Sequence, residues 1–189
     1  MGYQGTYRNN MRVFIVYYSL FGHIHQMAQA VASGVKDAGY DAELWRVPET
    51  LPNAVIEKMG ASAFQAEFRK LPVITPAELA TADAVIFGTP THHADICWQF
   101  KQWFDEISGH PKDGRTTYPL ADKLGAAFAT SDFAQGGAHV ALANLLSHML
   151  VQGMVVYSGG AAHGLPYLPY GAVSLTRPRF TCTPHAAPY

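Results

Sequence analysis

Apolar side chains follow two different periods along this chain. Residues 12–18, Arg-Val-Phe-Ile-Val-Tyr-Tyr, form an almost unbroken apolar run, as in strands of a parallel sheet that are buried on both faces. After a short turn, Ile24, Met27, Ala28 and Val31 recur at the spacing of a helix that packs one face against a sheet. This succession of strand, turn and helix predicts the first unit of an α/β domain.

The same alternation continues towards the far end of the chain. The apolar runs predict strands at 12–18, 42–47, 83–88, 124–131 and 154–158. The helical periods predict helices at 23–38, 94–107 and 138–152, with a short proline-led helix at 76–81. Strands that alternate with helices favour a parallel sheet covered on both faces. We therefore predict an α/β fold with a doubly wound, five-stranded parallel sheet.

The remaining segments divide the chain into a leader, one domain and a tail. We expect a flexible leader at 1–11, the folded domain at 12–174 and an atypical tail at 175–189. Three prolines in the tail rule out a regular helix there. Within the domain, 48–74 is expected to be a surface excursion with a possible helix at 53–69. Residues 108–118, rich in turn residues and charge, are expected to form an exposed loop.

Composition excludes several classes of function. The chain has 189 residues, 49% of them hydrophobic and 14% charged, and its net charge of −1 gives no basic surface for nucleic acid. The leader lacks an apolar secretion segment, and no apolar run approaches the roughly 18 residues of a membrane span. The chain has two cysteines, Cys97 and Cys182, and we expect both to be reduced thiols in a cytosol. We expect a cytoplasmic protein with no membrane insertion.

Three loops are predicted to form the ligand site. In open α/β sheets, ligands bind beyond the carboxyl ends of the strands, where the strand order reverses. The loop at 19–24 opens a helix, where free backbone N–H groups bind phosphate, and Gly22 allows the backbone to come close. The loops at 88–95 and 130–137 carry hydroxyl, ring and glycine residues suited to a flat polar ring. Together they indicate a mononucleotide with an aromatic head.

Three motifs carry a resemblance to a known family. Tyr-Tyr-Ser-Leu-Phe-Gly-His-Ile at 17–24, Arg-Val-Pro-Glu-Thr at 46–50 and Ile-Phe-Gly-Thr-Pro-Thr at 86–91 resemble the flavodoxin-like NAD(P)H:quinone oxidoreductases of the tryptophan-repressor-binding-protein (WrbA) type. The resemblance implies a sheet of order 2-1-3-4-5 that holds FMN noncovalently. It also implies a homo-oligomer, a dimer or tetramer, that passes two electrons from NAD(P)H to a small-molecule quinone. The final helix of that family is expected to be missing here.

The resemblance also implies which residues bind the cofactor. These are Ser19, Leu20, Phe21, Gly22, His23 and Ile24 around the phosphate, Pro90, Thr91, His92 and His93 beside the isoalloxazine, and Thr130, Ser131, Asp132, Phe133, Gly136 and Gly137 on its other side. Phe21 is expected to contact NAD(P)H or the quinone. No catalytic side chain is expected, because the flavin carries the hydride.

Two loops depart from the family pattern and leave other functions open. Thr91-His-His-Ala-Asp95 stands where the family has Thr-Arg-Phe-Gly-Asn, and Asp132 brings a negative charge that opposes an anionic reduced flavin. The alternatives are a flavodoxin-like electron carrier or redox sensor that binds FMN, and a degenerate paralogue without cofactor. The nine histidines predict no metal site, since Asp95 is the only carboxylate near the pair His92 and His93.

Overall fold

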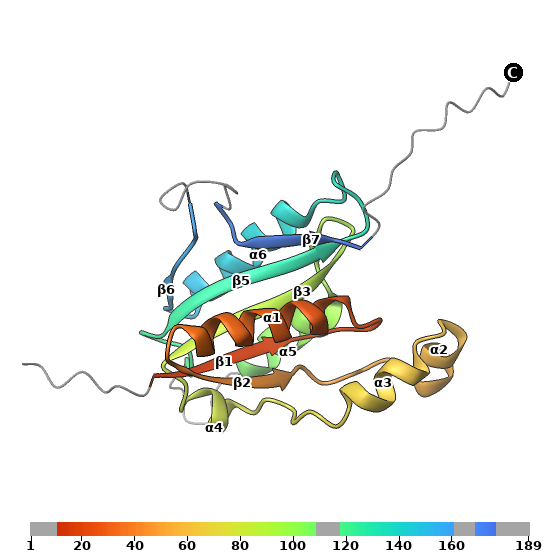
Figure 1. Cartoon of the computed structure of the whole chain (residues 1–189), viewed down its shortest axis with the longest axis horizontal. Coiled ribbons are helices and arrows are strands. Elements are labelled where there is room, and N and C mark those ends of the chain that lie inside the picture. Colours follow the sequence, from red (N-terminus) through yellow and green to blue (C-terminus); the bar gives the residue numbers. More distant parts are fainter. Residues whose placement is uncertain (1–10, 109–117, 161–168, 177–189) are drawn as a thin grey trace, which may run out of the picture.

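A computed structural model of the chain describes residues 11–108, 118–160 and 169–176 (Figure 1). The strands are β1 (Arg12–Tyr17), β2 (Asp41–Arg46), β3 (Ala84–His92), β4 (Asp95–Ile96), β5 (Leu124–Ser131), β6 (Val155–Val156) and β7 (Ala172–Leu175). The helices are α1 (His23–Asp37), α2 (Asn53–Lys58), α3 (Ser62–Phe68), α4 (Pro76–Leu79), α5 (Trp98–Ile107) and α6 (Ala138–Val151).

The parallel sheet has the order β2-β1-β3-β5-β6. Counted as the five strands expected from the sequence, this is the order 2-1-3-4-5, so the predicted flavodoxin-like topology is confirmed. Helix α1 covers one face of the sheet, and α5 and α6 cover the other (Figure 1). No helix in the described part of the chain is long and apolar enough to cross a membrane.

Strand β1 supplies side chains to both layers of the core, which explains its continuous apolar run. Phe14 and Val16 pack in the cluster that includes side chains of α5 and α6. Ile15 and Tyr17 pack in the cluster on the α1 side. All four are buried, as expected of a central strand covered on both faces.

The last strand of the sheet is interrupted, and this differs from the prediction. Instead of one strand at 154–158, the short β6 pairs with the beginning of β5 and β7 pairs with its end, both in parallel. β7 was not predicted, and its last residue, Leu175, belongs to the segment expected to be tail. Because β7 is only four residues long, it carries no readable strand period, whereas β6 lies within the strand predicted at 154–158.

The predicted helix at 94–107 begins four residues later than expected. Strand β3 continues through Thr91 and His92 and then turns back into β4, with which it pairs in antiparallel fashion. The turn places His93 and Ala94 in the left-handed region, at φ of 52° and 61°. The apolar positions at helical spacing therefore predicted a helix start within what is a tight hairpin. The turn of this hairpin is recognised only from the positive φ values in the structure.

The segment 48–74 was predicted to lie on the surface, and this is wrong in part. Two short helices replace the single helix expected at 53–69, separated by a turn in which Gly60 has a φ of 73°. Helix α3 buries Gln65 and Phe68, each 2% exposed. Residues 1–10 of the leader expected at 1–11, and residues 177–189 of the tail expected at 175–189, lie outside the described residues. The expected loss of a final helix and most of the loop expected at 108–118 lie outside them too.

We expect Gly171→Ala to detach β7 from β5. Gly171 has a φ of 129°, and a Cβ there would lie 2.1 Å from the carbonyl oxygen of Ala127. The variant should lose about 2 kcal/mol of unfolding free energy, as overpacked sites do, measured by urea denaturation. Gly34→Ala is the control, since a Cβ in that α1 position meets nothing within 4 Å and should stabilise the helix by about 0.5–1 kcal/mol. Equal effects of the two changes would contradict the packing described.

Candidate functional site

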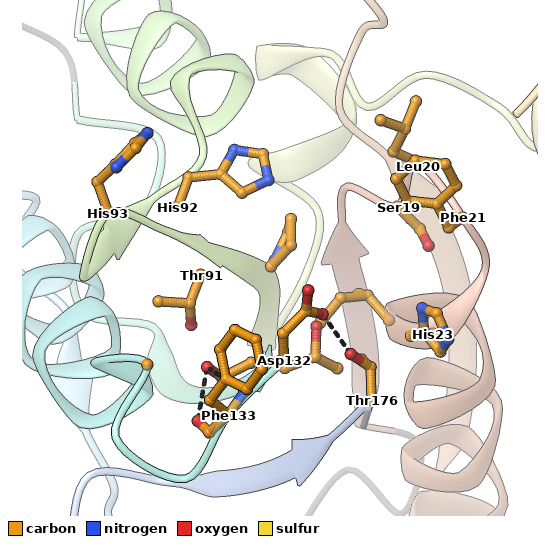
Figure 2. Close-up of a pocket in the computed structure, with 15 residues that line it drawn as sticks. Ser19, Leu20, Phe21, His23, Thr91, His92, His93, Asp132, Phe133 and Thr176 are labelled. Carbon is orange, nitrogen blue, oxygen red and sulfur yellow. Dashed lines mark hydrogen bonds between the residues drawn. The ribbon is translucent and has the colours of Figure 1, made fainter. Parts of the chain in front are cut away.

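A cavity of about 560 Å³ opens at the carboxyl ends of the strands, where the loops after β1, β3 and β5 meet (Figure 2). It is lined by Ser19, Leu20, Phe21, His23, Ile24, Pro90, Thr91, His92, His93, Thr130, Ser131, Asp132, Phe133, Gly136 and Thr176. Every residue predicted for the site lines this cavity except Gly22 and Gly137, which shape the backbone beside it. Thr176 was missed because it falls in the segment taken as tail.

The loop after β1 leaves several backbone donors unpaired. Gly22, at a φ of 98°, caps the N-terminus of α1, and its N–H donates to the Ser19 hydroxyl oxygen over 3.1 Å. Within the described part of the chain, the N–H groups of residues 20, 21, 23 and 24 have no hydrogen-bond acceptor. A cluster of free N–H groups at a helix N-terminus, beside a serine hydroxyl, is the donor set that binds a phosphate.

Helix α3 packs against the outer side of this loop. The Gln65 side chain donates from Nε2 to the carbonyl oxygens of Ser19 and Leu20, over 2.8 and 3.1 Å. A Cβ on Gly22 would lie 3.1 Å from the Phe64 ring. The sequence analysis missed this contact, although Phe64 and Phe68, four residues apart, already indicated a buried helix face.

The β3–β4 hairpin forms a second wall. The Thr91 hydroxyl is buried and has no hydrogen-bond partner among the described residues, and Thr91 lines the cavity. Gly137 at a φ of 86° lies against the turn, since a Cβ there would sit 2.3 Å from the Cβ of Ala94. This close approach brings the hairpin and the start of α6 together, and only glycine permits it.

The loop after β5 forms the third wall. The Ser131 hydroxyl donates to the Phe133 carbonyl oxygen over 3.0 Å and so closes a tight turn. Thr176, directly after β7, donates a hydrogen bond to the Asp132 carboxylate (Figure 2). The split last strand therefore ties the far end of the domain to this loop.

Histidine and aspartate side chains set the electrostatics of the cavity. Desolvation by the surrounding protein lowers the pKa of His92, the neighbouring His93 lowers it further, and Asp132 opposes the shift. His92 is therefore neutral at pH 7. Within residues 11–108, 118–160 and 169–176, no group of three or more His, Cys, Asp or Glu is placed to hold a metal ion.

Another histidine, His25, lies behind the loop after β1. A hydrogen bond of 2.6 Å joins the Tyr17 hydroxyl to His25 Nδ1. The His25 ring packs against Phe64 and Phe68, with centroid distances of 5.8 and 6.2 Å. Burial lowers the pKa of His25 and raises that of Tyr17, so both side chains are uncharged at neutral pH. This cluster joins α1, α3 and the sheet below the loop.

Comparison with known proteins bears directly on this site. Residues 11–164 match the family model described as NADPH-dependent FMN reductase. The chain belongs to this family of FMN reductases. A relative called NAD(P)H dehydrogenase (quinone), from Geotalea uraniireducens, is 45% identical over 158 residues, which cover 83% of this chain and 73% of the relative. A relative of the same name from Syntrophobacter fumaroxidans is 38% identical and covers 92% of this chain and 88% of its own.

Solved structures agree with this FMN reductase assignment. A WrbA-like flavodoxin from Agrobacterium tumefaciens superposes with a TM-score of 0.54 at 26% identity, covering 77% of this chain and 75% of that one. A flavodoxin from an archaeon superposes with a TM-score of 0.56 at 18% identity, covering 89% of this chain and 86% of its own, and shows the shared fold alone. The resemblance predicted from the motifs is confirmed.

We expect the stability of this FMN reductase family member to fall as the pH drops below about 6.5, the ordinary histidine pKa. A half-buried histidine with a lowered pKa, such as His25, binds its proton more readily in the unfolded chain, so acid favours unfolding. In urea titrations from pH 7.5 to 5.5, His25→Asn should flatten this fall, because it removes the half-buried titrating ring. Gln26→Asn, at an exposed neighbouring position whose side chain does not titrate, should leave the fall unchanged. Identical pH dependence in the two variants would contradict this role for His25.

Proposed function

We propose that this protein is an FMN-dependent oxidoreductase that transfers two electrons from NAD(P)H to a quinone. The observation that carries this proposal is the set of unpaired N–H groups at residues 20, 21, 23 and 24, which opens into the cavity between the three loops. Membership of the FMN reductase family and the names of the relatives support it. The cavity volume of about 560 Å³ lies in the range of small-molecule sites.

The residues present fit FMN in both its charged and its flat parts. Residues 19–24 would hold the phosphate through N–H groups and the Ser19 hydroxyl. Thr91, His92 and His93 would lie along one edge of the ring system, with the buried Thr91 hydroxyl free to bond a polar ring atom. Residues 130–137 would close the opposite side. When bound, the flavin supplies the hydride chemistry, and the protein supplies binding and orientation.

We assign Phe21 to the binding of the electron donor, NAD(P)H, and of the electron acceptor, the quinone. Its side chain is 52% exposed although it is large and apolar, and it lines the cavity. An exposed aromatic face beside the ring site offers a stacking surface to a nicotinamide or a quinone. Either reactant would use this surface in turn, so neither need be bound while the other reacts.

Charged side chains near the ring site would change how easily the bound flavin is reduced. The Asp132 carboxylate is held at the cavity by Thr176, and a negative charge there disfavours an anionic reduced flavin. His92, neutral at pH 7, adds no compensating positive charge. We propose that this FMN site is harder to reduce than one without an acidic residue in its third loop.

The same proposal extends to assembly and location. We propose a homo-oligomer, a dimer or tetramer, that acts in the cytoplasm with NAD(P)H as its electron donor. Leu124, Val155, Tyr157 and Val173 are between 40% and 58% exposed along β5, β6 and β7. Large apolar side chains gathered at one edge of a sheet support a contact with another copy.

We expect Gly22→Val to abolish FMN binding, measured by titration of the flavin fluorescence. A branched side chain at a φ of 98° strains the loop, and its Cβ would press on the Phe64 ring. Gly39→Val is the matched control: Gly39 has a φ of 87° with nothing within 4 Å of a Cβ, at the far end of α1. It carries the same backbone strain away from the site and should keep FMN binding. Unchanged affinity in Gly22→Val would overturn the placement of the phosphate.

We expect Phe21→Ala to lower kcat/KM for quinone reduction about fivefold, the value of one lost aromatic contact, while FMN affinity stays within about twofold. The assay follows NAD(P)H oxidation at saturating FMN and limiting quinone. Tyr40→Ala removes an aromatic that is 41% exposed near the opposite end of the sheet, and should change neither quantity. A matching loss of FMN affinity in Phe21→Ala would place Phe21 on the cofactor instead.

A further inference from the structure

The side chain of Gln65 joins helix α3 to the loop after β1. Gln65 lies on α3, 46 and 45 residues away in sequence from the two carbonyl groups that its side chain binds, and it is 2% exposed. Those carbonyls belong to Ser19 and Leu20, the first residues of the loop with unpaired N–H groups. The buried amide of Gln65 therefore binds two consecutive carbonyl groups at the start of the loop.

The orientation of this amide follows from its two partners. Carbonyl oxygens only accept hydrogen bonds, so the NH₂ end of Gln65 must face them. Its Oε1 atom is then buried without a hydrogen-bond partner among the described residues. A buried, unpaired acceptor is unfavourable, and the two loop contacts offset that cost. Gln65 therefore stabilises the conformation of the loop.

Fixing the two carbonyls also fixes two donors. In a trans peptide the C=O and the following N–H point in opposite directions. When the carbonyls of Ser19 and Leu20 point at α3, the N–H groups of Leu20 and Phe21 point away from it. These are two of the N–H groups that have no acceptor in the described part of the chain.

Helix α3 is anchored firmly enough to hold the loop. Phe68 is 2% exposed and packs against Tyr17 of β1, with a centroid distance of 5.5 Å, and Phe64 stacks on Phe68. Phe64 also lies against Gly22, at the bend of the loop. Gln65 is therefore carried by a helix that is packed on both sides of it.

We propose that Gln65 is a positioning residue that aims the N–H groups of Leu20 and Phe21 at the phosphate of FMN. It touches neither cofactor nor substrate, and it acts through the backbone of the loop. It determines how strongly the protein prefers FMN to riboflavin, the same flavin without the phosphate. This inference rests on the proposed FMN site and adds a residue outside the cavity to it.

The test measures the dissociation constants of FMN and riboflavin for two variants. Gln65→Met keeps the length of the side chain and removes both N–H donors, while Gln65→Asn keeps the amide but is too short to reach both carbonyls. Gln152→Met is the matched control. Gln152 is 3% exposed, donates to the Ser108 hydroxyl and has an unpaired Oε1, but caps the far end of α6. Thermal melting of each protein checks that it is folded.

Loss of two hydrogen bonds to the loop should weaken FMN binding about tenfold in both Gln65 variants. Riboflavin binding should change less than about twofold, because riboflavin has no phosphate for the loop to hold. Gln152→Met should leave the ratio of the two constants as in the wild type. If the Gln65 variants bind FMN and riboflavin with equally weakened affinity, or with unchanged affinity for both, the role of Gln65 is overturned while the FMN site stays in place. A wild-type protein that binds neither ligand would overturn the proposed function and this inference together.

Discussion

The conformation of the five residues between β1 and α1 is the constraint on which the site depends. A buried strand must become a helix within this short distance, and the left-handed Gly22 makes that turn possible. The first turn of any helix leaves N–H groups without partners, and here they collect at one end of the cavity. The strand that positions them is held between two layers of core, so the donors sit on a rigid support.

The other two walls depend on segments that are remote in sequence. The β3–β4 hairpin is held by the close approach of Gly137 to Ala94, and the third loop is held by Thr176 after β7. Splitting the last strand into β6 and β7 is what returns the chain to the cavity. The interrupted edge of the sheet thus contributes to the site as well as to the fold.

Local patterns of buried strands predicted the α/β fold and the three loops that form the site, and the resemblance carried by three motifs implied the strand order and nearly all of the cavity lining. Sequence analysis did not predict β7, the β3–β4 hairpin or the role of α3. β7 is too short to show a period, and the hairpin turn uses Ala94 at a φ of 61°, where local preference would place glycine. Gln65 has no local signal at all, since its partners lie 45 and 46 residues away. These features are set by tertiary contacts.

The most direct measurement is an anaerobic absorbance experiment on the wild-type protein loaded with FMN. NADH or NADPH is added first, and benzoquinone follows in the same cuvette. An FMN-dependent quinone reductase should show its flavin absorbance bleach with the nicotinamide and return fully with the quinone. A flavin that binds but is not bleached by either nicotinamide, or that is reduced but not reoxidised by the quinone, would contradict the proposed two-electron transfer.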